Sequence, residues 1–163
     1  MKKINIFIRN NHWKKGFLPC DSVSEKNNTI TNEIFEKGLK QHLELKDKVE
    51  YSVNWDDENF TSSMNTADVL LGWQFPTKNL NKIAPNLKWI HVISAGVNHL
   101  SPFTWMKKNL ILTNSSGVHA KKAGEFGLMS ILMLQNQMTK IITNQKKKKF
   151  VSLLGRPIEG SKV

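Results

Sequence analysis

The sequence predicts an α/β domain whose sheet has five strands and is mostly parallel. Five short apolar segments alternate with helix-like or turn-rich segments, and this alternation is typical of parallel sheets. Hydrophobic residues make up 39% and charged residues 23% of the 163 residues, which is enough apolar material for a core. This length suits either one domain or half of a two-domain enzyme.

The first third of the chain holds two of the predicted strands and one helix. Residues 3–9 are mostly apolar and predict a short buried strand. Thr31 is a suitable N-cap for a helix whose apolar positions run from Ile34 to Leu45. Residues 49–55 alternate apolar with polar side chains, as a half-buried strand does.

Three further strands are predicted over residues 67–73, 87–93 and 109–113. A short helix opens at Thr77 and is stopped by Pro85. Small or polar residues directly follow the last two strands, in residues 94–96 and 114–117. Because ligands bind at the carboxyl ends of the strands in such sheets, both loops are expected at the ligand-binding edge.

Residues 118–144 predict one long helix with almost no polar face in its middle. A five-stranded sheet covers only one side of such a helix, so a second domain or a second chain is expected to cover the other. We therefore divide the chain into a domain over residues 1–117, an interdomain or dimer helix over 118–145 and a basic tail over 146–163.

The net charge of +11 is concentrated in the last third of the chain. Residues 105–163 carry 11 Lys and Arg against 2 Asp and Glu. Only Arg9 and Arg156 are arginines, although arginine is the residue that reads guanine and phosphate with two hydrogen bonds. We expect no nucleic-acid partner, and a nucleic-acid binder resting on Lys146 to Lys149 is the least favoured hypothesis.

The single cysteine, Cys20, excludes an intramolecular disulfide and any multi-cysteine metal site. No metal site is expected, and a reducing cytoplasm fits this composition best. The longest apolar run, from Leu128 to Leu134, is too short to cross a bilayer, and the N-terminus has no secretory signal. We expect no membrane partner.

Few residues carry a recognisable chemical motif. The sequence has no phosphate-binding loop, nucleophile elbow, zinc-protease motif or glycine-rich dinucleotide fingerprint. His99 and His119 each follow a strand-end loop, and Asp68 and Glu125 are the carboxylates expected nearest the ligand edge, with capping or packing as the alternative for both.

The loop Ser94-Ala95-Gly96-Val97 has two interpretations. Its small side chains let consecutive backbone amides approach a ligand, and such a concavity suits a carboxylate. The alternative is a tight turn that merely needs glycine.

A resemblance follows from the order of several short segments. They are Ala67 to Gln74, Pro85 to Ile90, Ser94-Ala95-Gly96-Val97-Asn98-His99-Leu100, Leu112 to Gly117, and Gly124-Glu125-Phe126 before the apolar helix. In this order they resemble the N-terminal substrate domain of the D-isomer-specific 2-hydroxyacid dehydrogenases, most closely the glyoxylate/hydroxypyruvate reductase-like branch. The resemblance covers roughly residues 3–145.

This resemblance implies a flavodoxin-like, three-layer substrate domain joined by crossing helices to a Rossmann domain that binds NAD or NADP. It implies that the amides of Ala95, Gly96 and Val97 hold the carboxylate of a small 2-keto or 2-hydroxy acid, and that Trp73 is an aromatic residue at the cleft wall. His119 and Ala123 would border the nicotinamide, and the intact enzyme would be a homodimer.

The chain departs from the family pattern at several points. Gly124 replaces the usual Ala before Glu125, and Asn98 stands where Asp is usual. The family's fingerprint, catalytic arginine, carboxylate and histidine are expected beyond Val163, so no catalytic residue is assigned here.

The leading hypothesis is therefore the substrate-binding half of an NAD(P)-dependent oxidoreductase acting on CH–OH donors, truncated and inactive alone. The alternative is a stand-alone flavodoxin-like binding or dimerisation module without catalysis.

Overall fold

The computed structural model describes residues 2–12, 26 and 28–162. The loop expected after the first strand, with Gly16, Pro19 and Cys20, lies outside these residues. The chain divides into two compact units between Ser116 and Gly117, and each unit has its own secondary structure.

The first unit is built on a five-stranded, fully parallel sheet, which confirms the predicted fold class. Each strand lies within two residues of its predicted position. The strands are β1 (Ile4–Asn10), β2 (Val49–Trp55), β3 (Val69–Gly72), β4 (Trp89–Val92) and β5 (Ile111–Asn114).

The strand order is β2-β1-β3-β4-β5, the flavodoxin-like order. The central strand β1 pairs with β2 on one side and β3 on the other, with Ile6 opposite both Tyr51 and Val69. The direction of winding reverses between β1 and β3, so the carboxyl ends of these two strands form the switch point at which such sheets bind ligands.

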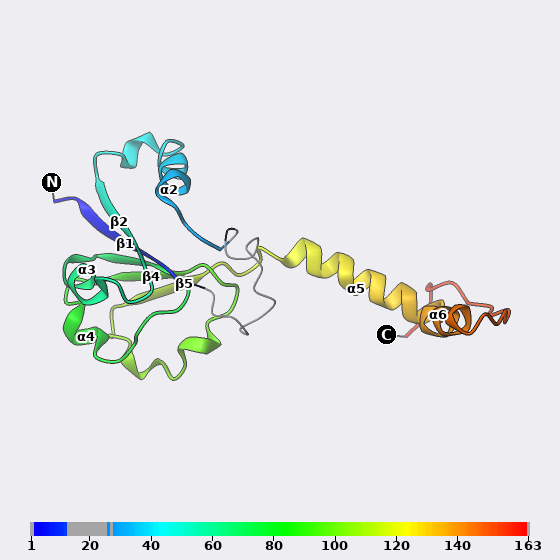
Figure 1. Ribbon diagram of the computed structural model, residues 1–163. Coiled ribbons are helices and arrows are strands. Elements are labelled where there is room, and N and C mark those ends of the chain that lie inside the picture. Colours follow the sequence, from blue (N-terminus) through cyan, green and yellow to red (C-terminus); the bar gives the residue numbers. More distant parts are fainter. Residues whose placement is uncertain (1, 13–25, 27, 163) are drawn as a thin grey trace. The chain divides into compact units, whose positions relative to one another are not determined.

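Helices lie on both faces of the sheet, as Figure 1 shows for α2 (Asn32–Leu39), α3 (Phe60–Thr66) and α4 (Leu80–Ile83). Thr31 caps α2 as predicted, because its hydroxyl accepts a hydrogen bond from the Ile34 amide. The helix ends at Leu39, earlier than expected, and a short 3-10 turn over Leu43–Leu45 follows it.

The two faces of the sheet are packed by different helices. On one face, Phe35 of α2 contacts Tyr51 of β2, with ring centroids 4.5 Å apart. On the other face, Phe60 of α3 packs against Phe7 of β1 at 6.0 Å. The main core lies on this second face. Its fully buried members include Phe7, Met64, Leu70, Leu80, Ile90 and Val92.

The second unit contains two helices, α5 (Ala120–Gln135) and α6 (Met138–Lys146), where we expected one helix over residues 118–144. The prediction of a single long helix is thus wrong. Gln137 adopts a left-handed conformation with φ of 53°, which ends the first helix, and the Asn136 side chain donates to the Leu132 carbonyl. The sequence pattern continues through this break because the apolar residues on both sides keep similar spacing.

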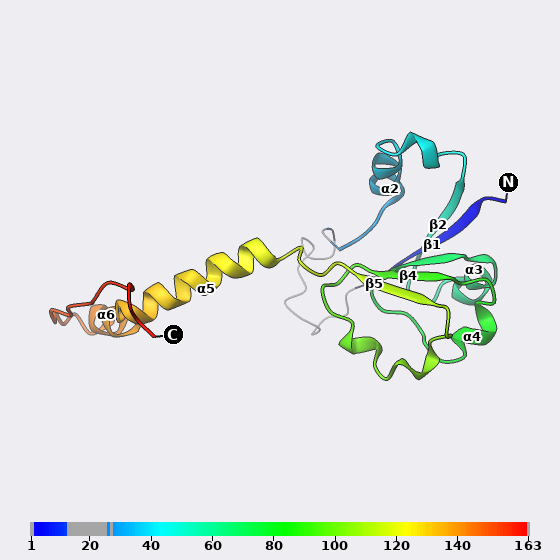
Figure 2. The ribbon, with the colours of Figure 1, turned by 180° about the vertical axis from the view of Figure 1, so that it is seen from behind.

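Every residue of α5 is at least partly exposed, including large apolar side chains such as Phe126, Leu128 and Leu134. Beyond α6 the tail turns back along the helices, and the Gln135 side chain donates to the Arg156 carbonyl (Figure 2). Across the described parts of the chain, no helix has the length and apolar character needed to span a membrane.

Two Gly→Ala substitutions are expected to have opposite effects on stability. At Gly72, the end of β3, an added Cβ would lie 2.8 Å from the Arg9 carbonyl oxygen, so Gly72→Ala should destabilise the protein by about 1–3 kcal/mol. At Gly38, within α2, no described atom lies within 4 Å of an added Cβ, so Gly38→Ala should stabilise by about 0.5–1 kcal/mol. Urea denaturation measures both, and equal effects would contradict this packing of β3 against β1.

Candidate functional site

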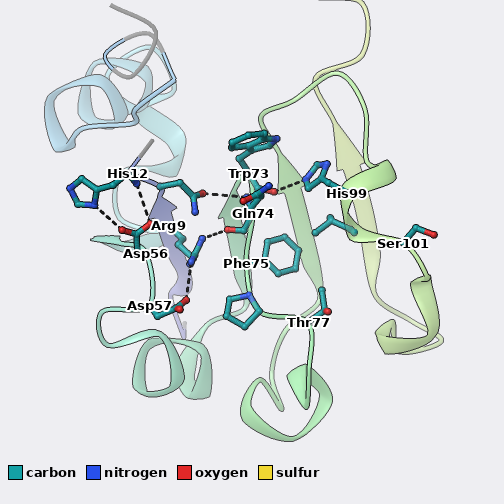
Figure 3. A pocket seen from close by; sticks show the side chains of 13 residues that line it. Arg9, His12, Asp56, Asp57, Trp73, Gln74, Phe75, Thr77, His99 and Ser101 are labelled. Carbon is teal, nitrogen blue, oxygen red and sulfur yellow. Dashed lines mark hydrogen bonds and ion pairs between the residues drawn. The ribbon is translucent and has the colours of Figure 1, made fainter. Parts of the chain in front are cut away.

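A cavity of about 570 Å³ lies at the carboxyl edge of the sheet, at the switch point between β1 and β3. Figure 3 shows Asp56 and Asp57 on one side of it, His99 and Ser101 on the other, and Trp73, Gln74 and Phe75 between them. The described lining residues come from the end of β1 and from the segments that follow β1, β2, β3 and β4. They are Arg9, Asn11, His12, Asp56, Asp57, Trp73, Gln74, Phe75, Pro76, Thr77, His99, Leu100 and Ser101.

Arg9 is the buried cation of this cavity, with a relative exposure of 5%. Its Nη2 donates to the Asp57 carboxylate at 2.9 Å, and its Nη1 donates to the Gln74 carbonyl. The guanidinium also lies 5.6 Å from the centre of the Phe60 ring. Among the described residues, no hydrogen-bond partner reaches its Nε. Arg9 therefore joins the segments after β2 and β3 to the end of β1.

Side chains from other segments hold the backbone of the wall formed by Trp73 and Gln74. The Asn11 side chain accepts a hydrogen bond from the Gln74 amide at 3.3 Å, Arg9 donates to the Gln74 carbonyl, and His99 donates to the Trp73 carbonyl at 2.9 Å. Because three polar groups of two consecutive residues are fixed in this way, the wall is set in position before any ligand arrives.

The His99 ring has a defined tautomer in this network. A carbonyl oxygen only accepts hydrogen bonds, so the His99 Nε2 that faces the Trp73 carbonyl carries the hydrogen. In the neutral ring, Nδ1 is then an acceptor. The ring also packs against Trp73, with centroids 5.8 Å apart.

His12 and Asp56 are hydrogen-bonded to each other at the rim of the cavity. The His12 Nδ1 lies 2.8 Å from one Asp56 carboxylate oxygen, and the His12 amide donates to the other at 3.1 Å. Partial burial alone would raise the pKa of Asp56. The hydrogen bonds from His12 and the charges of His12 and Arg9 outweigh that effect, so the pKa lies below its ordinary value of 3.8.

The loop predicted to bind a carboxylate lies at the same edge of the sheet, directly after β4. Ala95 and Gly96 are exposed, and Val97 packs partly against the core. The Ser94 hydroxyl donates to the Gly96 carbonyl, and the Asn114 side chain donates to the Ala95 carbonyl. These bonds engage carbonyl groups of the loop. Trp73 lines the cavity, whereas Ala95, Gly96 and Val97 are not among its described lining residues.

The position expected for Asp68 is wrong. Asp68 directly precedes β3 and so lies at the amino edge of the sheet, opposite the cavity. It is buried and accepts hydrogen bonds from the Asn5 amide and the Lys88 ammonium. Burial alone would raise its pKa, but these two partners lower it. Asp68 therefore has the packing role that was the alternative, and Glu125 pairs with Lys122 on the surface of α5.

Sequence reasoning missed the residues contributed by β1 and β2 to the cavity. Arg9 and Asn11 lie at the end of β1, and Asp56 and Asp57 directly follow β2. The rule that ligands bind at the carboxyl ends of strands would have found them, if the strand order had been known.

The fold and the cavity together define a flavodoxin-like α/β domain with a cavity at its switch point. The sequence-family model for the catalytic domain of the D-isomer specific 2-hydroxyacid dehydrogenases matches residues 20–152 of this chain. The chain therefore belongs to this family. No curated protein matches it in a sequence comparison.

Solved structures share the fold. A D-isomer specific 2-hydroxyacid dehydrogenase family protein from Aeromonas salmonicida superimposes with a TM-score of 0.63 at 17% identity, covering 96% of this chain and 44% of that one. A D-isomer specific 2-hydroxyacid dehydrogenase family protein from Klebsiella pneumoniae 342 gives a TM-score of 0.56 at 19% identity, covering 96% of this chain and 42% of that one. A probable 2-hydroxyacid dehydrogenase from Rhizobium etli CFN 42 was solved in complex with NADP, HEPES and L(+)-tartaric acid. It gives a TM-score of 0.61 at 17% identity, covering 94% of this chain and 42% of that one. The chain spans less than half of each.

A dinucleotide fingerprint forms a glycine-rich turn between a strand and a helix, whereas Gly124 and Gly127 lie inside α5. His119 directly precedes α5 without a capping hydrogen bond from its side chain, and Ala123 lies in the first turn; both side chains are exposed. Their contact with a nicotinamide stays a prediction.

Replacing His12 should return the pKa of Asp56 towards its ordinary value. In the wild-type protein, the stability from this pair is present above pH 3.8 and is lost as the pH falls through the lower pKa of the folded state. We expect His12→Ala to raise the pKa of Asp56 in a carboxyl NMR titration. His42→Ala, which removes the exposed partner of Glu44, is the matched control and should leave Asp56 unchanged. An unchanged Asp56 pKa in His12→Ala would contradict the pairing.

Proposed function

We propose that this chain is the substrate-binding half of an NAD(P)-dependent oxidoreductase that interconverts 2-hydroxy acids and 2-keto acids in the cytoplasm. Family membership supports the class of reaction, and the cavity at the switch point is the observation that carries the proposal. In such an enzyme the nicotinamide exchanges a hydride with C2 of the substrate. This chain would bind and orient the acid, and it would show no turnover alone.

The backbone amides of Ala95, Gly96 and Val97 are the proposed site for the substrate carboxylate. The loop follows β4 at the same edge as the cavity, and the exposed Ala95 and Gly96 carry small side chains. Small side chains let an anion approach consecutive N–H groups closely. The cavity wall at Trp73 would contact the rest of a glyoxylate-like or hydroxypyruvate-like substrate.

We also propose that α5 forms a homodimer surface. Phe126, Leu128 and Leu134 are 55%, 56% and 72% exposed, and burying them against a second copy would remove this apolar area from water. Sedimentation velocity should show a dimer that Leu128→Glu converts to monomer. A wild-type protein that stays monomeric at about 0.1 mM would contradict the proposal.

Glycolate titration of the ¹⁵N-labelled protein tests the carboxylate site. We expect the amide signals of Ala95, Gly96 and Val97 to shift, and Gly96→Val to weaken binding at least fivefold because a larger side chain covers the amides. Gly38→Val is the control, since no described atom lies within 4 Å of an added Cβ at either glycine. If glycolate leaves all three amides unshifted, the proposed function fails.

A further inference from the structure

The cavity is larger than the small acids of the proposed function require. Its volume of about 570 Å³ lies in the middle of the roughly 300–1,000 Å³ range of pockets that enclose drug-sized ligands. A two- or three-carbon keto acid fills only a small part of that space. If the carboxylate binds at Ala95–Val97, the cavity is available for a longer tail on the same molecule.

The cavity presents more hydrogen-bond acceptors than its own donors use. One Asp57 oxygen accepts from Arg9, and the Asp57 side chain is 73% exposed, so its other oxygen can accept from a ligand. Asp56 accepts two bonds from His12, but a carboxylate offers about four acceptor positions. On the opposite side, the Nδ1 of neutral His99 is also an acceptor. Such a lining suits a ligand that donates hydrogen bonds.

The charge of the lining argues against a second anionic group on the ligand. Apart from the histidines, Arg9 contributes one positive charge, while Asp56 and Asp57 contribute two negative charges. Arg9 is already committed to Asp57 and the Gln74 carbonyl. A terminal carboxylate or phosphate would face the two carboxylates without a free cation among these described groups, and like charges at short range repel.

An apolar tail fits the lining poorly as well. It would cover part of the Asp56 and Asp57 carboxylates without giving them donors, and burying unsatisfied polar groups is costly. A hydroxylated chain avoids this penalty because each hydroxyl both donates and accepts. Its CH groups can pack on Trp73, which lines the cavity.

We propose that the cavity is a subsite for the neutral, polyhydroxylated tail of the substrate, which makes the preferred acid a monocarboxylic sugar acid of about five or six carbons. Asp56, Asp57 and the Nδ1 of His99 accept hydrogen bonds from its hydroxyl groups. This inference rests on the proposed function for the position of the carboxylate, and it adds a specificity for the rest of the molecule.

The test compares four acids by NMR titration of the ¹⁵N-labelled 163-residue protein: glycolate, D-gluconate, D-glucarate and hexanoate. Gluconate should shift the Trp73 indole and Gln74 amide signals in addition to the loop amides, and should bind at least fivefold more tightly than the other three. Asp57→Asn, which can still accept from Arg9, should weaken gluconate binding at least threefold. Asp47→Asn, at an exposed position, is the matched control.

The outcomes separate this inference from the proposed function. If glycolate shifts the Ala95–Val97 amides but gluconate binds no more tightly and leaves Trp73 and Gln74 unshifted, the tail subsite is wrong and the function stands. Glucarate or hexanoate binding as tightly as gluconate would also overturn it. If gluconate shifts the cavity signals while no acid shifts the loop amides, the subsite is supported and the proposed carboxylate site fails.

Discussion

The candidate site depends on a buried arginine at the end of the central strand. A guanidinium is costly to bury unless its donors find partners, and Arg9 pairs its two Nη nitrogens with the Asp57 carboxylate and the Gln74 carbonyl. The two acceptors belong to segments that follow different strands, so satisfying one cation fixes the ends of β1, β2 and β3 together. Lysine could not do the same, because its ammonium lacks the planar fork of donors that spans two separate acceptors.

The parallel sheet explains why these groups meet at all. In a sheet of parallel strands every carboxyl end lies at the same edge, and winding outward from β1 in both directions leaves a gap at the switch point. Gly72 lets β3 end close to the Arg9 backbone. Asn11 and His99 then fix the Trp73–Gln74 wall from either side. The cavity is thus a consequence of the strand order, and its chemistry comes from short polar segments directly after the strands.

Local patterns predicted the strands well and the site only in part. Alternation fixed β2 at residues 49–55, and the Thr31 cap followed from residue type alone. Strand order depends on long-range pairing that no local pattern encodes, so Arg9, Asn11, Asp56 and Asp57 could not be brought together from the sequence. Asp68 was expected near the ligand edge, but it stands directly before β3, and the start of a strand lies at the amino edge of this sheet. The prediction of one long helix is wrong at Gln137, where a left-handed residue ends the helix although the apolar pattern of the sequence continues.

The central claim is that Arg9 holds the wall of the cavity in place, and amide hydrogen exchange tests it most directly. The Gln74 amide donates to Asn11 within the wall, whereas the Leu70 amide lies in β3 and reports the stability of the sheet. In Arg9→Lys, the account predicts that exchange at Gln74 accelerates at least tenfold more than exchange at Leu70. If both amides change by the same factor, or if Gln74 keeps its protection, Arg9 is not the residue that organises this site.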